Sequence, residues 1–288
     1  SDMESIDSKP RNRLEIGTIL YNSDERTFDR FLQALALNIL DCRVKNIDIS
    51  LRIKWNSPPT FALRQVKALS DIPHVIEEGF YNAGFGRAHN RMMNNAFESG
   101  ATYYLCINPD GFLDIDAAST IVNFYENLPT KGIVEAIQFP REHPKQYNPF
   151  TFETAWCSGA CLLIAQHVYS QIGGFDDNIF MYCEDIDLSW RTKERGLKCY
   201  ICPNALFFHD VRESKSNLVR KMMLDSARYL AIKWQNKEFK TFIENVLLSD
   251  HYYKNLSDMP SYDDVKKHSM DPKIQEWRYM LSFSQVRW

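Results

Sequence analysis

An α/β fold with a mostly parallel sheet, followed by a helical C-terminal extension, is predicted by two features of the sequence. Over residues 14–140, apolar segments of strand length alternate with segments whose apolar residues recur at helical spacing. This alternation is typical of right-handed β-α-β crossovers, which build parallel sheets. After His209 the strand pattern ends, and amphipathic helical segments follow at 216–234 and 237–248.

The first half of the predicted sheet starts with the apolar run at 14–21, which ends in Asn-Ser-Asp, residues that suit a turn or a helix cap. Residues 28–40 carry apolar side chains at helical spacing. Residues 47–55 alternate as a strand does and stop at Asn-Ser-Pro-Pro. The further elements of this half are a short helix at about 60–70, a strand at 75–78, and a helix that follows the turn at 82–90 and runs to Ser99.

The second half is predicted in the same way. Its elements are a buried strand at 103–107, a helix at 115–127, a strand at 132–139, a polar Pro-rich loop at 140–153, a strand at 156–164, a helix from about Glu184, and strands near 198–202 and 205–209. We therefore divide the chain into an N-terminal segment at 1–13, a body at 14–212 with halves at 14–110 and 111–212, and the extension at 213–288.

The composition is that of an ordered globular protein. The 288 residues are 44% hydrophobic and 13% aromatic, which excludes a disordered chain and allows a substantial core. No apolar stretch approaches the ~20 residues needed to cross a membrane, and the first residues lack the apolar core of a signal peptide. Met3 follows a Ser-Asp dipeptide that resembles a remnant of cloning, and a cytoplasmic protein is the simplest expectation.

The net charge of −3 does not favour nucleic acid as a partner. The charge is uneven, because residues 212–288 hold 14 basic and 10 acidic side chains, a net of +4, and the rest of the chain has a net of −7. Scattered solvated charge accounts for such a difference. The extension is also suited to contact an anionic membrane surface or the body of the protein, and its helices to form a homodimer.

The seven cysteines are odd in number, and most lie inside apolar runs, as reduced, buried thiols do. Cys157 and Cys161 together with Cys199 and Cys202 have spacings that could form a zinc site. Residues 198–203 are predicted as a strand, however, and residues three apart on a strand point to opposite faces. Structural thiols are therefore the preferred interpretation.

Acidic residues and a histidine follow apolar segments in a pattern that indicates a metal and a base. Glu184, Asp185 and Asp187 open a predicted helix, whereas Asp110 and His209 each follow or end a strand. In parallel sheets, ligands bind beyond the carboxyl ends of the strands. A close acid pair raises one pKa and can keep a base near its working range. The pattern predicts an enzyme that transfers a phosphate-activated group, with Asp187 as the structural member of the three acids.

Each of these residues also has a plainer interpretation. Asp110 lies in Asn-Pro-Asp-Gly, which favours a turn by itself. The acids at 184–187 are favoured in the first turn of a helix by the helix dipole. A lone histidine such as His209 is more often a core or surface residue than a ligand. The turn at 82–90 has Gly84-x-Gly86, but His89 stands where a dinucleotide fingerprint needs a third small residue. A dinucleotide site is therefore not expected, although the turn can bring backbone close to a phosphate or a base.

Taken together, these segments resemble the inverting glycosyltransferases of family 2, and within them the bacterial rhamnosyltransferase-like branch. The resemblance spans residues 14 to about 235 and is carried by the order and spacing of its motifs. These motifs are Asn-x-Gly-Phe-Gly-x-Ala-x-Asn at 82–90, Asn-Pro-Asp at 108–110, Gly-Gly-Phe-Asp at 173–176, Phe-x-Tyr-x-Glu-Asp-x-Asp-Leu-x-x-Arg at 180–191, and His209.

The resemblance implies a GT-A fold, a Rossmann-like mixed sheet in which a nucleotide-binding half joins an acceptor-binding half. It implies that Asp110, as the last acid of a DxD-type motif, holds a Mg or Mn ion at the diphosphate of the donor together with His209. It also implies that Asp185 is the base that deprotonates the acceptor hydroxyl. Glu184 would position the acceptor or tune that base.

The same resemblance assigns residues to the two substrates. Family members usually carry Asp-Asn after the second strand, and here Trp55 stands in the place of that acid, where a stacking contact could substitute for it. The donor-binding residues that we expect are Tyr21, Asn22, Trp55, Asn82, Gly84, Arg87, Asn90, Asn108 and Asp110. The acceptor-binding residues that we expect are Trp156, Ser158, Gly159, Phe180 and Tyr182. Acceptor choice is expected to depend on the loop at 140–153 and the C-terminal helices, since loops on a rigid scaffold usually carry specificity.

The resemblance implies transfer of a sugar from dTDP-rhamnose or a UDP-sugar to a hydroxyl of a glycan or lipid-linked acceptor in bacterial cell-surface polysaccharide synthesis, in the cytoplasm or at the inner face of the plasma membrane. One alternative is a nucleotidyltransferase, which needs a Gly-rich, basic phosphate loop that the segment after Thr18 lacks. Another is a catalytically silent sugar-nucleotide-binding or scaffold protein, which the presence of all the acids and the histidine disfavours.

Overall fold

The computed structural model describes residues 11–209, 216–282 and 285–286. Its centre is a mixed sheet of eight strands. Their order is β3 (His74–Ile76), β2 (Ile47–Trp55), β1 (Asn12–Leu20), β4 (Tyr103–Ile107), β8 (Cys161–Ala165), β6 (Gly132–Phe139), β9 (Lys198–His209) and β5 (Gly111–Leu113). The pairs β1–β2, β2–β3, β1–β4 and β6–β9 are parallel, and the pairs of β8 and β5 with their neighbours are antiparallel. The predicted α/β class with a mixed sheet is confirmed.

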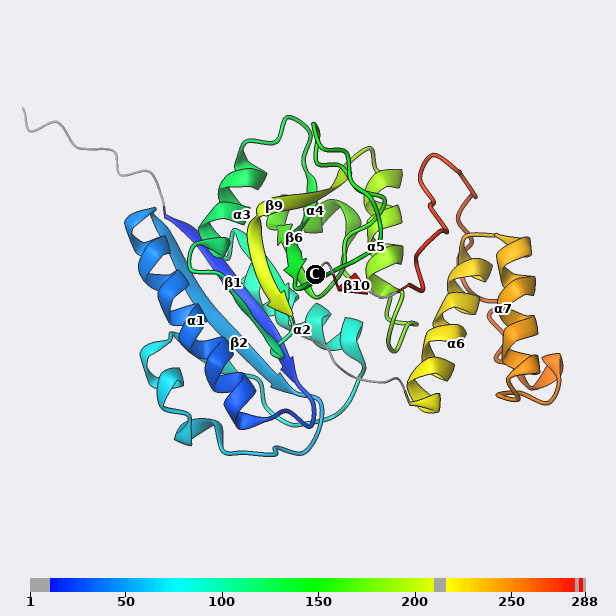
Figure 1. Ribbon diagram of the computed structural model, residues 1–288, viewed down its shortest axis with the longest axis horizontal. Coiled ribbons are helices and arrows are strands. Elements are labelled where there is room, and N and C mark those ends of the chain that lie inside the picture. Colours follow the sequence, from blue (N-terminus) through cyan, green and yellow to red (C-terminus); the bar gives the residue numbers. More distant parts are fainter. Residues whose placement is uncertain (1–10, 210–215, 283–284, 287–288) are drawn as a thin grey trace, which may run out of the picture.

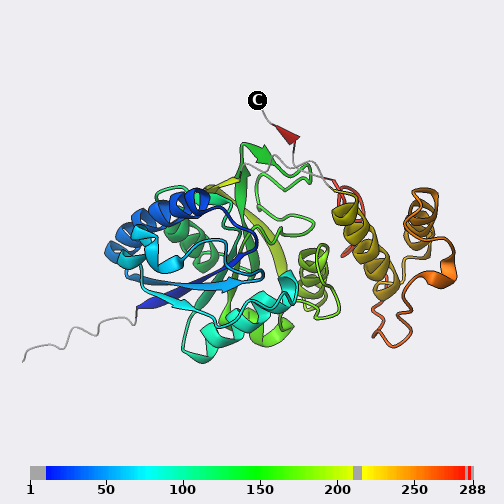
Figure 2. The same cartoon turned by 90° about the horizontal axis from the view of Figure 1, so that it is seen from below.

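Helices cover both faces of this sheet, and two more form a separate layer (Figures 1 and 2). The helices are α1 (Glu25–Val44), α2 (Phe85–Glu98), α3 (Ala117–Glu126), α4 (Gln166–Ile172), α5 (Glu184–Glu194), α6 (Asn217–Lys233) and α7 (Lys237–Ser249). Helices α1 and α3 contact each other on one face, and α2 lies on the other. The predicted cap before α1 is confirmed, because the Asp24 side chain accepts a hydrogen bond from the Thr27 amide at 3.0 Å.

The structure differs from the predicted elements in several places. The helix expected at 60–70 is a pair of short 3₁₀ turns, Leu63–Gln65 and Lys67–Asp71. The strands expected near 198–202 and 205–209 are one strand, β9, which shifts register against β6 between Ala136 and Ile137. The sequence pattern breaks between the two expected strands, but β9 continues to pair with β6 across that break.

Three further differences concern shorter segments. Residues 156–160, expected as the start of a strand, form a loop before β8, and neither β5 nor α4 was predicted. Strand β1 begins at Asn12, inside the predicted N-terminal segment at 1–13, whereas residues 1–10 lie outside the described part. The predicted boundary at 212/213 also lies outside the described residues.

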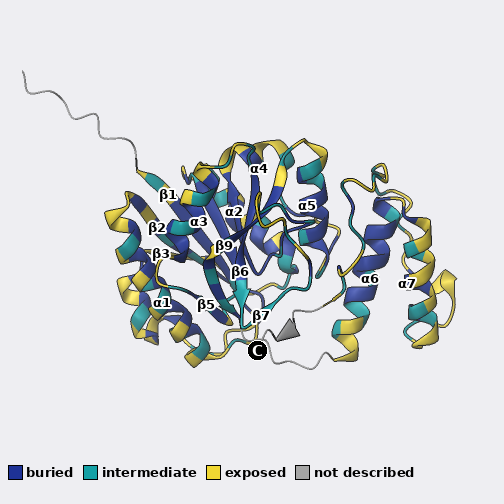
Figure 3. Ribbon diagram, turned by 45° about the horizontal axis from the view of Figure 1, so that its top comes forward, coloured by how far each residue is buried: buried dark blue, intermediate teal, exposed yellow. Residues whose placement is uncertain are grey.

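Two hydrophobic clusters hold the molecule together. The larger one lies between the sheet and its helices and draws residues from β1, β2, β4, β5, β6, β8 and β9. The second joins one side of α5 to the C-terminal helices and includes Trp190 and Trp234, whose rings meet edge to face at 5.6 Å. Figure 3 shows the buried faces of α5 and α6 turned toward each other. Helix α5 is therefore packed from both sides, and the C-terminal helices are part of its support.

The last described segment of the chain forms a separate two-stranded sheet. Strand β10 (Gln285–Val286) pairs antiparallel with β7 (Arg141–Glu142), directly after β6 (Figure 2). In the described ranges, no helix has both the length and the apolar character that a membrane span requires.

Candidate active site

A cavity of 660 Å³ opens where the strands β1, β4 and β9 end. Many of the site residues expected from the sequence line it together. They are Tyr21, Asn82, Asn108, Asp110, Trp156, Ser158, Gly159, Tyr182, Glu184, Asp185 and His209. The cavity has the size of an ordinary small-molecule site and lies at the strand ends, where open α/β sheets bind ligands.

At one end of the cavity, Asp110 and His209 form a pair. The Nε2 atom of His209 lies 2.8 Å from Oδ1 of Asp110, although the two residues are 99 positions apart. The short strand β5 brings them together, because Gly111 is the partner of His209 in its pairing with β9. The strand that sequence analysis missed is thus the element that builds this end of the site.

Gln138 fixes the orientation of the His209 ring. Its side-chain oxygen accepts a hydrogen bond from Nδ1 of His209 at 2.9 Å, and its amide group donates to Oγ of Ser158 at 3.2 Å. When the ring is neutral and its hydrogen is on Nδ1, Nε2 has the lone pair that a metal ion between His209 and Asp110 would use. A partner that holds the other ring nitrogen, as Gln138 does, prepares a histidine to bind a metal.

The donor set fits a divalent cation such as Mn²⁺ or Mg²⁺ that is shared with a phosphate ligand. A carboxylate oxygen and an imidazole nitrogen suit Mn²⁺, and Mg²⁺ commonly takes few protein ligands and several from phosphate and water. The described residues contain no group of three or more His, Cys, Asp or Glu placed to hold a metal ion. Asp110 and His209 would therefore hold the ion together with oxygens of a bound diphosphate.

Replacing Gln138 with leucine is expected to weaken metal binding by roughly 10–100-fold, because the His209 ring loses the partner that orients it. The affinity for Mn²⁺ can be measured by titration calorimetry in the presence of a nucleoside diphosphate. Gln33→Leu on the exposed face of α1 is the matched control and should bind as the unmodified protein does. Equal affinities in both variants would contradict this role of Gln138.

Glu184 and Asp185, which also line the cavity, begin α5. Asp185 accepts hydrogen bonds from the amides of Gly159 and Ile186, both at 2.9 Å. Burial raises the pKa of Asp185, and these amides act against it. Burial and then the charge of Asp185 raise the pKa of Glu184 well above its usual range. Because Asp185 has the donors that favour a carboxylate, we assign the negative charge to Asp185 and the retained proton to Glu184.

The start of α5 is a strained turn. Tyr182 and Cys183 both have left-handed backbone angles, with φ of 71° and 64°. Such angles cost on the order of 1–3 kcal/mol each for residues other than glycine and persist only where packing enforces them. Cys183 is part of the second hydrophobic cluster, which supplies that packing. The turn aims the two carboxyl groups at the cavity.

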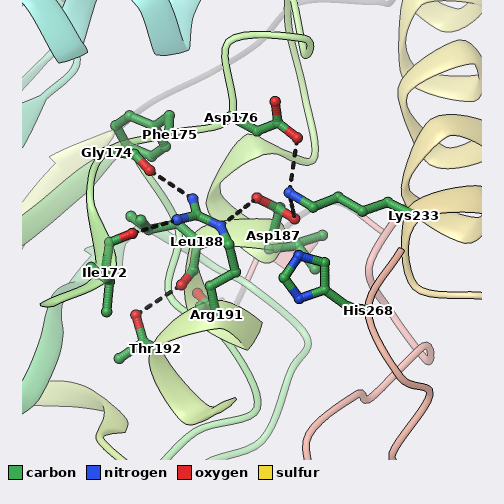
Figure 4. A network of polar contacts seen from close by, with 12 residues as sticks. Ile172, Gly174, Phe175, Asp176, Asp187, Leu188, Arg191, Thr192, Lys233 and His268 are labelled. Atoms are coloured by element: carbon green, nitrogen blue, oxygen red, sulfur yellow. Dashed lines mark hydrogen bonds and ion pairs between the residues drawn. The ribbon is translucent and has the colours of Figure 1, made fainter. Parts of the chain in front are cut away.

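A buried ion network anchors the first turns of α5, as Figure 4 shows. Asp187 accepts hydrogen bonds from Arg191 at 2.9 Å, Lys233 at 2.8 Å and Trp234 at 3.0 Å. Lys233 also contacts Asp176 at 2.8 Å. The predicted structural role of Asp187 is confirmed, and its partners come from α6 as well as from its own helix.

Three residues expected to bind the donor instead support a neighbouring loop. Asn90 bonds the backbone of Phe175 through both its amide nitrogen and its oxygen, and Arg87 donates to the backbone oxygen of Asp177. Gly84 has φ of 89°, and a Cβ atom there would lie 2.3 Å from the backbone oxygen of Phe180. The turn at 82–90 therefore allows close approach to protein backbone, and none of these three lines the cavity.

The stacking role expected for Trp55 is also wrong in this structure. Its side chain is only 4% exposed and packs edge to face on Phe61 at 5.1 Å. Asn56 lines the cavity instead, and its side-chain oxygen accepts from Lys54 at 2.7 Å. Trp55 belongs to the core because it ends β2 on the face that packs against apolar neighbours.

Two other expected residues lie apart from the cavity lining. The backbone N–H of Asn22 donates to Oγ of Ser57 at 2.9 Å, so Asn22 shapes the turn after β1. Phe180, expected to bind the acceptor, is 46% exposed and does not line the cavity. The cysteines are all buried and free, and Cys157 contacts the backbone oxygen of Tyr200, as expected of structural thiols.

Sequence reasoning missed several cavity residues. They are Asn56, Gln138, Arg141, His143, and Met280 to Ser282 of the C-terminal segment. Burial lowers the pKa of His143 to about 3, so its ring is neutral. Gln138 could have been found, because it lies at the carboxyl end of a correctly predicted strand. The C-terminal residues carry no comparable signal in the sequence.

Comparison with known proteins begins with sequence. No family model matches the chain. The chain is 37% identical over 65 residues to the N-acetylglucosaminyl-diphospho-decaprenol L-rhamnosyltransferase of Mycobacterium tuberculosis, covering 23% of this chain and 21% of that protein. It is 37% identical over 82 residues to the rhamnosyltransferase WbbL of Escherichia coli K12, covering 27% and 31%. The matches therefore span less than a third of these relatives, and they confirm the resemblance to rhamnosyltransferases.

Solved structures extend the likeness to most of the chain. A mannosyltransferase from Pyrobaculum calidifontis, in complex with GDP-Man and Mn²⁺, aligns with a TM-score of 0.52 at 14% identity and covers 86% of this chain and 77% of its own. Residues 1–349 of S. aureus TarS with UDP-GlcNAc align at 0.55 with 11% identity, over 82% and 73%. GalNAc-T7 with UDP, GalNAc and Mn²⁺ aligns at 0.59 with 8% identity, over 88% and 53%.

The chain has the GT-A fold. In this glycosyltransferase fold, the cavity described above lies at the carboxyl ends of β1 and β4. The Asp110–His209 pair lies at one part of its wall, and the Glu184–Asp185 pair lines the same cavity from α5. The GT-A fold expected from the sequence is thus confirmed.

Proposed function

We propose that this protein is an inverting, metal-dependent glycosyltransferase of bacterial cell-surface polysaccharide synthesis. The observation that carries the proposal is a single cavity lined both by a carboxylate–imidazole pair suited to a metal and by a carboxylate suited to act as a base. A metal at the carboxylate–imidazole pair would stabilise the diphosphate that leaves a sugar-nucleotide donor. The other carboxylate would take the proton of the acceptor hydroxyl.

The donor is proposed to be a nucleoside-diphosphate sugar, either dTDP-rhamnose or a UDP-sugar. The names of the relatives in M. tuberculosis and E. coli support a rhamnosyl donor, and one structural neighbour is in complex with UDP-GlcNAc. Tyr21, Asn82 and Asn108 offer an aromatic ring and amide groups in the same cavity as Asp110. These groups suit a nucleoside and a phosphate.

The proposed reaction is one in-line displacement. Asp185 takes the proton of the acceptor hydroxyl, and the acceptor oxygen bonds to the anomeric carbon of the donor sugar. The bond from that carbon to the diphosphate oxygen breaks, which inverts the configuration, and the transition state has oxocarbenium character. A Mg²⁺ or Mn²⁺ ion held by Asp110 and His209 would neutralise the charge that grows on the diphosphate.

The acceptor is proposed to be a lipid-linked oligosaccharide. Next to the polar groups at Asp185 and Ser158, the cavity has an apolar wall formed by Met181, Val219, Met223, Met280 and Leu281. Arg141 lines the same cavity, and within the described residues its guanidinium forms no ion pair. A sugar with a phosphate and an apolar tail matches a wall of this kind better than a purely polar glycan does.

Such an acceptor would bring the protein to the inner face of the plasma membrane. Buried, unpaired cysteines are typical of proteins kept in a reducing compartment, which supports a cytoplasmic location. Leu218, 67% exposed near the start of α6 and close in sequence to the apolar wall, is suited to a peripheral membrane contact.

The test is donor binding and turnover with Asp110→Asn. The unmodified protein is expected to gain thermal stability from one donor of a panel when Mn²⁺ is present, to lose that gain with chelator, and to release the nucleoside diphosphate. Asp110→Asn should lose most of the metal-dependent gain. The matched variant Asp116→Asn changes an exposed acid directly before α3 and should keep it. Equal behaviour of the two variants would contradict the metal site, and donor binding without any release would favour a catalytically silent module.

A further inference from the structure

Lys145 comes from the Pro-rich loop at 140–153 and reaches the interior of the protein. Its side chain is 3% exposed, and its ammonium lies 2.8 Å from both carboxylate oxygens of Glu135 on β6, whose side chain is also 3% exposed. The ammonium lies 4.9 Å from the centre of the Trp156 ring. Buried ion pairs add little to stability compared with an apolar pair of the same volume, so this one calls for another explanation.

Glu135 connects this ion pair to the loop that forms the cavity wall. Its second oxygen accepts a hydrogen bond from the amide of Ser158 at 2.7 Å. The next amide along the chain, that of Gly159, donates to Asp185 at 2.9 Å. Two successive amides of one loop therefore bind two carboxylates, one held by Lys145 and the other at the cavity.

The charges around Asp185 give Lys145 a second effect. Glu184 on the same helix and Glu135 on β6 are the acids that face it, and the thiols of Cys106 and Cys183 lie near. Burial raises the pKa of Asp185, the amides of Gly159 and Ile186 act against this, and the positive charge of Lys145 lowers the pKa further. Lys145 thus helps to oppose the effect of burial on Asp185.

We propose that Lys145 is a positioning residue for Asp185, which it keeps oriented and ionised through Glu135 and the loop of Ser158 and Gly159. Lys145 touches no substrate in this arrangement. The proposal rests on the proposed function only in naming Asp185 as the base. The contacts themselves predict how Asp185 titrates, whether or not the protein transfers a sugar.

A merely structural ion pair makes a different prediction. If Lys145 and Glu135 only fill the interior, replacing both by neutral residues of similar shape leaves the titration of Asp185 unchanged. If Lys145 acts on Asp185, removing its charge raises the pKa of Asp185 even in a well-folded protein. A variant that keeps the charge should keep the pKa.

The experiment follows the side-chain carboxyl carbon of Asp185 by ¹³C NMR in protein labelled at aspartate, with Asp185→Asn to assign the signal. The double variant Glu135→Gln/Lys145→Met has no buried charge to leave unpaired and is expected to fold. Lys145→Gln, which removes the positive charge and leaves Glu135 in place, should raise the Asp185 midpoint by about one pH unit. The double variant also removes the opposing charge of Glu135, so its midpoint should lie between those of Lys145→Gln and the unmodified protein. Lys145→Arg, which keeps the charge, should titrate close to the unmodified protein.

A second measurement compares the pH dependence of sugar transfer. In Lys145→Gln, the acidic limb of kcat/KM should move to higher pH by the same amount, while Lys145→Arg keeps the original limb. An unchanged NMR midpoint in Lys145→Gln, which retains Glu135 and its bond from Ser158, would overturn the proposal. If Lys145→Gln does not fold, the double variant, whose interior holds no unpaired charge, serves for the same comparison with a smaller expected rise.

The two measurements separate this proposal from the proposed function. A raised midpoint in a protein that turns over no donor would support the role of Lys145 and count against transferase activity. A normal midpoint together with active transfer would support the function and overturn the role of Lys145.

Discussion

Replacing Asp185 with asparagine is expected to lower kcat for sugar transfer by about 10²–10⁴-fold while donor binding persists, since general base catalysis contributes that much. Asparagine has the same shape, and its oxygen can still accept the hydrogen bond from the Gly159 amide, whereas its NH2 group cannot accept the one from Ile186. Persisting donor binding is therefore the sign that the loss is chemical rather than structural. The measurements are product formation at saturating donor and acceptor, and the donor dissociation constant with Mn²⁺.

The pH dependence gives an independent check on this base. Asp185 must be ionised to accept a proton, and burial raises its pKa. The rate of the unmodified protein should therefore fall as the pH is lowered through that raised pKa, and rise to a plateau above it. The residual activity of Asp185→Asn should lack this limb. Loss of donor binding in Asp185→Asn, or a retained limb, would show that the base is another group.

Replacing Lys233 with methionine is expected to destabilise the protein by about 3–5 kcal/mol, because it leaves buried carboxylates without their cation. Lys233 is 8% exposed and bridges Asp176 and Asp187, whose side chains are 10% and 0% exposed (Figure 4). Arg191 would remain the cation on Asp187, and the Trp234 indole would still donate to it. A fall in melting temperature on the order of 10 °C should be seen by calorimetry.

The matched control for this variant is Lys240→Met on the neighbouring helix α7. Lys240 is 40% exposed and pairs with Glu244, so its loss should cost at most about 1 kcal/mol. Because Asp187 is two residues beyond Asp185 on α5, Lys233→Met should also reduce transfer at temperatures where the protein is still folded. Equal melting temperatures of the two variants would show that α6 does not support the catalytic helix.

Most of the fold was open to prediction because its elements have strong local patterns. The strand at 132–139 and the helices at 216–234 and 237–248 are confirmed closely by β6, α6 and α7. The helix expected to follow the turn at 82–90 and run to Ser99 is α2, which already begins at Phe85 within that turn. Strand β5 was missed because Gly111–Leu113 is too short to show a period, and it exists through its pairing with β9.

The residues of the candidate site were also predicted only in part. Asp110, Glu184, Asp185 and His209 were found from acids and a histidine at strand and helix ends, and they line one cavity. Trp55 was misplaced because a resemblance of motifs fixes position along the chain but not the face on which a side chain lies. Gln138 and Lys145 were missed because their roles depend on partners far away in the sequence.

The sequence by itself determined the α/β class, the GT-A resemblance and the acids that mark the cavity, because periodicity and motif spacing are local properties of the chain. The tertiary structure decided which residues meet. It brings Asp110 into contact with His209, 99 positions away, and buries the Trp55 side chain in the core. It also pairs Lys145 and Lys233 with buried carboxylates. These outcomes depend on strand pairing and side-chain packing between distant segments, which a local pattern does not specify.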